Sequence, residues 1–140
     1  MKAISLWQPW ATAIVVGNKR IETRSWPTKY RGPLAIHAAK RWDKDQKEFA
    51  SVEYTLRRLP KRLPFGAIVA VAMLIDVRPT FVLLGESLVS PIEKIYGDYG
   101  QGRWGWIFSE IYPLPEPIPF RGAQGLFNVP DELFPATRDR

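Results

Sequence analysis

The sequence has 140 residues, with 20 lysines and arginines, 14 aspartates and glutamates, and no cysteine. This length suits one domain, and the missing cysteines exclude disulfides, thiolate zinc sites and cysteine nucleophiles. His37 is the one histidine, so a histidine-rich metal site is excluded as well. The net charge of +6 favours a nucleic-acid partner.

No segment of the sequence is typical of a membrane-spanning or an exported protein. The longest apolar run, residues 67–75, is much shorter than a membrane helix. The first residues lack the apolar stretch of a signal peptide. We therefore expect a cytoplasmic protein that does not contact a membrane.

The first forty residues predict three short strands and one helix. The strands are expected at residues 2–7, 19–26 and 34–39. The helix begins at residues 8–10, where a proline suits the first turn, and Gly17 ends it. In the second strand, Glu22 and Arg24 share one face and Lys19 lies on the other, unless a bulge brings it round. In the third strand, His37 is expected on the face away from the core.

An amphipathic helix is predicted to begin after Asp43 and to end before Pro60. Asp43 and Gln46 have the spacing of a capping box. The apolar stripe recurs at helical spacing, and it consists of Phe49, Val52, Leu56 and Leu59.

The second half of the chain predicts further strands. Residues 67–75 are apolar throughout, which favours a strand covered on both faces. Residues 78–101 are the least regular part and predict a loop with short helical pieces. Residues 103–108 predict a strand with Trp104, Trp106 and Phe108 in the core.

Four alternate prolines at positions 113, 115, 117 and 119 exclude a central strand at that point. Residues 125–129 are expected to form the last strand, and residues 131–140 a tail. Several short strands with few helices favour a small barrel whose gaps are filled by helices.

Six blocks of residues, spread over nearly the whole chain, resemble the ASCH (ASC-1 homology) domain family of the PUA-like superfamily. The blocks are Leu6-Trp7-Gln8-Pro9-Trp10, Gly17-x-Lys19-x-x-Glu22-x-Arg24-x-Trp26, Arg31-Gly32-Pro33-Leu34-x-Ile36-His37-Ala38, Leu63-Pro64-x-Gly66-Ala67-Ile68, Trp104-Gly105-Trp106, and the segment from Leu114 to Phe127. The resemblance implies an α+β fold, a PUA-like small β-barrel with flanking helices, formed by residues 1–140 as a single domain.

The resemblance also implies RNA as the partner, because PUA-like relatives bind RNA. Some members of the family cleave single-stranded RNA with magnesium, and one bacterial branch deacetylates N4-acetylcytidine through a Lys-x-x-Thr arrangement. This sequence has Lys19-x-x-Glu22, and a carboxylate cannot serve as a hydroxyl nucleophile. The amidohydrolase activity is therefore the weaker expectation.

We predict that a basic cleft binds single-stranded or modified RNA. Lysine and arginine side chains hold phosphates, and an indole ring is a platform for a base. The RNA-binding residues are expected to be Gln8, Lys19, Arg24, Trp26, Tyr30, Arg31 and Lys40.

Three alternatives accompany this prediction. In an enzyme, Lys19, Glu22 and His37 would be catalytic, and Glu22 would hold magnesium in a ribonuclease. Glu22 and Arg24 would otherwise form a structural ion pair. The alternate prolines leave open a protein-interaction module, since extended proline segments dock on aromatic grooves.

Overall fold

Short helices and strands alternate along the chain in the computed structural model, which describes residues 1–134. In chain order the elements are β1 (Lys2–Leu6), α1 (Trp10–Val15), β2 (Ile21–Arg24), β3 (Gly32–Ala38), α2 (Lys44–Arg57), β4 (Ala67–Pro79), α3 (Thr80–Gly85), α4 (Pro91–Tyr96), β5 (Trp104–Pro119), β6 (Phe127–Asn128) and a 3-10 helix (Asp131–Leu133). The two short helices α3 and α4 confirm the prediction for residues 78–101.

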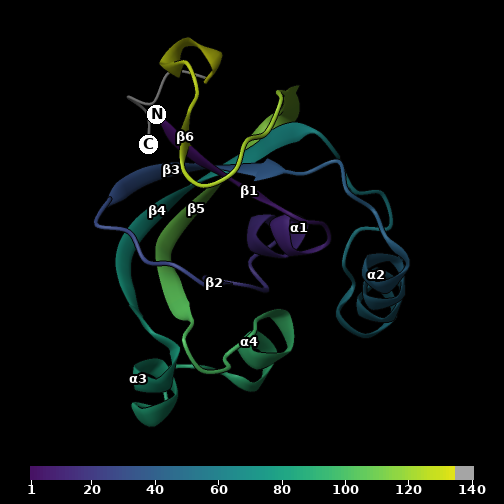
Figure 1. The fold of residues 1–140 in the computed structure, drawn as a ribbon. Helices are drawn as coiled ribbons and strands as arrows, with labels where there is room; N and C mark the ends of the chain where they lie inside the picture. Colours follow the sequence, from purple (N-terminus) through teal and green to yellow (C-terminus); the bar gives the residue numbers. More distant parts are fainter. Residues whose placement is uncertain (135–140) are drawn as a thin grey trace.

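Within residues 1–134, six strands form one mixed sheet in the order β2-β5-β4-β3-β1-β6. β1 runs parallel to β3, and the other neighbouring pairs are antiparallel. Long, curved β4 and β5 sweep around α1, which lies on the concave side of the sheet (Figure 1). The expected α+β fold is confirmed, but the sheet does not close into a barrel. Its two ends, β2 and β6, are only four and two residues long and do not pair with each other in the described residues.

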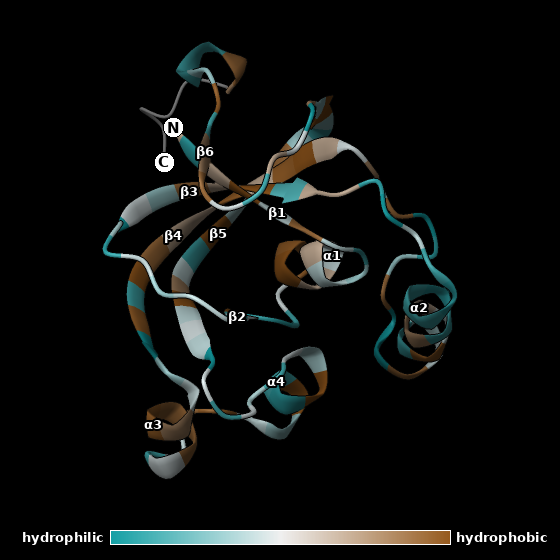
Figure 2. Cartoon of the chain, in the orientation of Figure 1, coloured by the Kyte–Doolittle hydropathy of each residue, from teal (hydrophilic) through white to brown (hydrophobic). Residues whose placement is uncertain are grey.

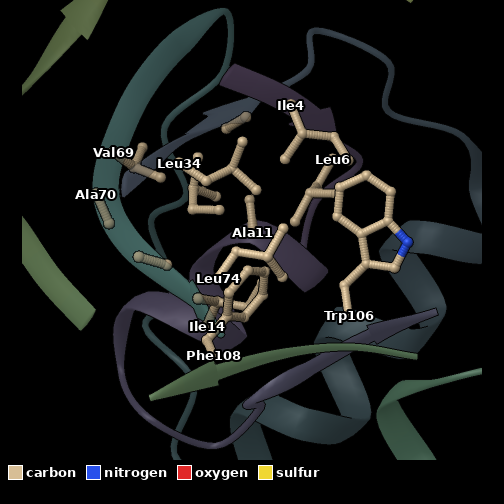
Figure 3. Close-up of a cluster of buried hydrophobic side chains, with 13 residues drawn as sticks. Ile4, Leu6, Ala11, Ile14, Leu34, Val69, Ala70, Leu74, Trp106 and Phe108 are labelled. Atoms are coloured by element: carbon tan, nitrogen blue, oxygen red, sulfur yellow. The ribbon is translucent and has the colours of Figure 1, made fainter. Parts of the chain in front are cut away.

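The main core lies between α1 and the concave face of the sheet. Ile14 of α1 packs against Leu34 of β3 and against Trp106 and Phe108 of β5 (Figure 3). This confirms that the tryptophan-rich start of β5 belongs to the core. The opposite face of β3 and β4 is covered by residues 114–134, so β4 is covered on both faces as predicted, up to Leu74. Ile75 beyond it is 53% exposed.

The helix α2 has the predicted capping box at Asp43 and Gln46, but only the two ends of the predicted apolar stripe are packed: Leu59 is 1% exposed and Phe49 packs beside it. Val52 and Leu56 are exposed, and much of α2 is hydrophilic in Figure 2. The buried side chains are Gln46 and Glu53. Besides the packing of Phe49, hydrogen bonds dock the helix: Gln46 Nε2 donates to the carbonyl of Gln8 at 2.8 Å, and Glu53 accepts from the Tyr96 hydroxyl at 2.6 Å.

The proline segment lies on an edge of the sheet. The first residues of β5 lie between β2 and β4, whereas Pro113 and Pro119 pair with β4 alone among the described residues. This confirms that the alternate prolines are not in a central strand. The expected tail begins with the 3-10 helix and the buried Phe134, and residues 135–140 lie outside the described residues. No helix among residues 1–134 is long and apolar enough to cross a membrane.

Candidate nucleic-acid interface

Two hollows in the surface contain the side chains relevant to binding. The first, which we call the tryptophan pocket, has a volume of about 580 Å³ and is lined by Trp7, Trp10, Glu22, Arg24, Trp26 and Arg103, among others. The second, which we call the basic groove, has a volume of about 1100 Å³ and is lined by Ser5, His37, Lys40, Phe65, Arg121 and Gln124, among others. Ser5 lines both. Five predicted site residues are thus divided between two neighbouring hollows: Glu22, Arg24 and Trp26 in the first, and His37 and Lys40 in the second.

A compact ion cluster lies at the floor of the tryptophan pocket. Glu22 and Arg24 extend from the same face of β2, as the strand period predicts, and Arg24 Nη1 lies 3.2 Å from Glu22 Oε2. The other oxygen, Glu22 Oε1, lies 3.5 Å from Lys19 Nζ. Lys19 reaches this carboxylate because it precedes β2, so the alternation of side chains between the two faces of the strand does not apply to it. Glu22 is therefore shared by two cations.

Lys19 lies beneath this floor and does not line the pocket. Its side chain is 1% exposed, and its ammonium group donates to the carbonyls of Ile21 at 2.6 Å and Tyr96 at 2.8 Å. The Glu22 carboxylate at 3.5 Å adds an opposite charge to these two hydrogen bonds. Lys19 joins the start of β2 to the end of α4, and the geometry gives it a scaffolding position.

Trp26 is both a core contact and a wall of the pocket. Its ring meets Trp106 edge to face at 4.9 Å, and its carbonyl accepts from the Trp106 indole at 3.2 Å. The Arg24 guanidinium lies over the Trp26 ring at 5.6 Å. Trp26 therefore packs in the core and also has the pocket position expected for a base platform.

Trp7, Trp10 and Arg103 were not predicted as site residues. Trp7 is 48% exposed, and the Arg41 guanidinium stacks on it at 4.2 Å, while Trp10 stacks on Phe49 at 5.3 Å. Two tryptophans on either side of the residues that start a short helix are the sequence signal that could have identified them. Arg103 follows the least regular segment, where the sequence pattern carries no such signal.

Arg103 closes one side of the pocket. Its guanidinium donates to the carbonyls of Thr23 at 3.0 Å and Asp98 at 3.1 Å, and it lies 3.5 Å from the Asp98 carboxylate. The adjacent Thr23 hydroxyl accepts from the Asp98 N–H at 2.9 Å. These contacts fix the turn after α4 to β2.

A buried carboxylate fastens α4 to the start of β2. Glu93 Oε2 accepts from the backbone N–H of Arg20 at 2.6 Å, while Oε1 has no partner among the described residues. Burial raises the pKa of this carboxyl, opposed by that N–H bond and by the Lys19 charge. Burial also raises the pKa of Tyr96 to about 12, and its hydrogen bond to Glu53 adds to the rise.

Four of the predicted RNA-binding residues line neither hollow, and Lys19 beneath the tryptophan pocket is one of them. Gln8 is fully buried, and its amide bonds Thr12 and the carbonyl of Pro64. The Tyr30 hydroxyl donates to the Pro33 carbonyl. Arg31 donates to the carbonyls of the same turn. These side chains hold local structure in place.

His37 lies at the basic groove and not at the tryptophan pocket. The face of β3 expected to be away from the core is covered by residues that follow β5, so His37 is only 2% exposed. Its Nε2 lies 2.7 Å from the Phe120 carbonyl, which can only accept, so Nε2 carries the hydrogen and the Ser5 hydroxyl donates to Nδ1 at 2.8 Å. Burial lowers the pKa of His37, opposed by the Phe120 bond.

Glu22 is a poor fit to the magnesium site expected for a ribonuclease. Within residues 1–134, no three histidine, aspartate or glutamate side chains come close enough together to hold a metal ion. Magnesium can also bind through one carboxylate and substrate phosphates. Both oxygens of Glu22, however, already face cations, which would repel the ion.

The curved mixed sheet around a short helix defines an α+β domain of the PUA-like class. Its fold is similar to that of ASCH from Zymomonas mobilis, with a TM-score of 0.57 and 22% identity over 94% of this chain and 88% of the other. A mutant of that protein, in which one tyrosine is replaced by phenylalanine, matches with the same TM-score over 91% of its chain.

Residues 4–101 match the family model of the ASCH domain, and the chain therefore belongs to the ASCH domain family, which is associated with RNA binding. It is also 38% identical over 80 residues to activating signal cointegrator 1 of Homo sapiens and of Mus musculus. That match spans 52% of this chain but only 14% of each of those proteins.

Proposed function

We propose that this protein binds single-stranded RNA and holds the base of one nucleotide in the tryptophan pocket. The observation that carries the proposal is the lining of that pocket: three indoles surround it, and two guanidinium groups lie at its wall. Bases stack on aromatic faces at about 1–3 kcal/mol each. The volume of about 580 Å³ falls in the usual range for ligand sites.

Trp7 is the best candidate for the stacking platform. It is 48% exposed, whereas Trp26 and Trp10 each have another ring against them. Arg41 already stacks on the Trp7 ring at 4.2 Å, which supports its ability to hold a flat, polarisable group. A base would use the same type of contact.

The polar groups of the pocket support recognition better than catalysis. The Lys19 ammonium is directed at two carbonyls and Glu22, and the Thr23 hydroxyl is bonded to Asp98. A nucleophile with an adjacent base is the arrangement that covalent hydrolysis requires. These side chains are bonded to the scaffold, which favours a binding module over the ribonuclease or the amidohydrolase.

Trp7→Ala tests the proposal, with Tyr54→Ala as its control. Tyr54 on α2 is 47% exposed and has Lys61 over its ring at 5.9 Å, so it matches Trp7 in exposure and type of contact but lies outside both hollows. Fluorescence anisotropy with a short labelled single-stranded RNA should show affinity reduced by about 5- to 150-fold in Trp7→Ala, from the stacking energy. Tyr54→Ala should bind as the wild type does.

Equal affinity of the wild type and Trp7→Ala for RNA would contradict stacking of a base on Trp7 in this pocket. The absence of RNA binding by the wild type would contradict the proposal as a whole. Analysis of the RNA after long incubation with magnesium separates binding from cleavage. Intact RNA is expected, and shortened products that disappear in Glu22→Gln would instead favour the ribonuclease.

A further inference from the structure

The two hollows differ in whether their cationic side chains have acidic partners. In the tryptophan pocket each arginine has an acidic partner: Arg24 faces Glu22 and Arg103 faces Asp98. Among the described residues, no acidic side chain lines the basic groove. Within residues 1–134, its two cations Lys40 and Arg121 take part in no ion pair. Both cations of the groove are therefore without an acidic partner among the described residues.

The stem of Lys40 is positioned by the backbone. It lies against Gly66, where a Cβ would come within 2.8 Å of Lys40 Cε and 3.0 Å of Cγ. Gly66 also has a φ of +63°, and it is bonded through its N–H to the Ala38 carbonyl at 2.7 Å. Because Gly66 has no side chain, the Lys40 stem can cross directly over its backbone. The stem is thereby held at the groove, which both residues line.

The opposite wall is brought close by His37 and a second glycine. A Cβ at Gly122 would lie 2.7 Å from His37 Cε1 and 3.1 Å from Ser5 Oγ. The bond between His37 and the Phe120 carbonyl holds this segment against β3 at 2.7 Å. Arg121 lies between these two anchored residues and lines the groove.

The two hollows adjoin at Ser5, which lines both. A single strand with one base in the tryptophan pocket would pass Ser5 on its way out. A groove with two unpaired cations and no acid among the described residues matches the backbone phosphates of that strand.

We propose that the basic groove is a phosphate site for the nucleotides next to the one held in the tryptophan pocket. Lys40 and Arg121 contact the phosphates, and His37 positions the Arg121 segment. This inference rests on the proposed function and narrows its ligand to an oligonucleotide, because a free nucleoside would fill the tryptophan pocket and leave the groove empty.

The test compares the double variant Lys40→Gln, Arg121→Gln with a control of equal charge, Lys47→Gln, Arg62→Gln. The control cations are exposed, lie outside both hollows and form no ion pair within residues 1–134. Binding of a short labelled oligouridine is measured by anisotropy from low to high salt. Equal melting temperatures of the two variants confirm that both are folded.

The groove variant should show a salt slope smaller by about 1.4, since each phosphate contact to a single strand contributes about 0.7. That difference corresponds to roughly 25-fold weaker binding near 0.1 M salt, converging with the wild type toward about 1 M. The control pair should keep a slope closer to that of the wild type. Quenching of tryptophan fluorescence at saturating RNA should persist in the groove variant, because the tryptophan pocket is intact.

Two results separate the failure of this inference from that of the proposed function. If groove and control variants lose affinity and slope equally, while Trp7→Ala still weakens binding, the groove is not a phosphate site but the base pocket stands. If the wild type binds no oligouridine and no mixed-sequence RNA, both proposals fail.

Discussion

Replacing Glu22 by glutamine removes the anion that two cations share. Glu22 is 8% exposed and Lys19 only 1%, so the ammonium of Lys19 would remain buried with neutral acceptors alone. Removal of one partner from a buried ion pair costs about 3–5 kcal/mol. Arg24 is partly exposed and can turn to water, and the glutamine oxygen still accepts one bond, so we expect a cost somewhat below this range, about 2–3 kcal/mol. For a chain of this length that loss lowers the melting temperature by roughly 6–12 °C.

The matched control is Asp98→Asn, which makes the same kind of change in the same pocket. The Asp98 side chain is 68% exposed and lies 3.5 Å from Arg103, and exposed pairs contribute about 0–1 kcal/mol. Both variants are followed by thermal and urea unfolding at neutral pH. If Glu22→Gln melts within about 1 °C of Asp98→Asn, the buried ion pair does not stabilise the fold. The folded Glu22→Gln protein should bind RNA equally well or better, since an anion has left the site.

Three further predictions concern ionisation and burial. The pKa of Tyr96 is raised from 10.0 to about 12, so the unfolded chain loses this proton first and stability should fall as pH rises from about 10 to 12; Tyr96→Phe should flatten that part of a urea-denaturation profile. Burial lowers the pKa of His37 from 6.5, so stability should fall as pH drops below about 6.5; denaturation at pH steps from about 7 to 5 should show a weaker dependence in His37→Asn, and an unchanged slope would contradict it. Leu56 is 65% exposed and Glu53 is 2% exposed, so Leu56→Gln should change the free energy of unfolding by less than about 0.5 kcal/mol. Glu53→Gln should cost about 1–3 kcal/mol, measured by the same unfolding curves.

Local patterns predicted the strands well, because strand period and proline chemistry act within a few residues. The shared face of Glu22 and Arg24 follows from a period of two, and the covered strand follows from its uninterrupted apolar run. The alternate prolines likewise restrict a segment to an edge whatever it packs against.

The buried side of α2 was predicted only in part: Phe49 and Leu59 are packed as expected, but the middle of the helix is held by distant polar partners. Val52 and Leu56 have helical spacing, yet Gln46 and Glu53 face inward because Gln8 and Tyr96 supply hydrogen-bond partners. Burying a polar group is tolerable only when it is bonded. Nothing in the stripe itself indicates that such partners exist in segments 38 and 43 residues away.

The site was predicted in part for the same reason. Glu22, Arg24 and Trp26 come from one strand and the residues just after it, so their proximity is local. His37 and Lys40 lie at a strand whose outer face is covered by residues 120–124, and Phe120 is 83 residues further along than His37. Because of that long-range contact, His37 and Lys40 line a hollow separate from the tryptophan pocket. The spacing of residues along β3 gives no indication of such a contact.

The proline edge of β5 also affects how molecules of this protein meet one another. An uncovered strand edge normally offers a row of N–H and C=O groups on which another chain can assemble as a further strand, and this is a common start of aggregation. Prolines at alternate positions carry no N–H, and alternate residues of a strand present their donors to the same side. The half of β5 that pairs with β4 alone among the described residues thus lacks N–H donors that an added strand would need, which makes this edge a poor template for a strand from a second copy.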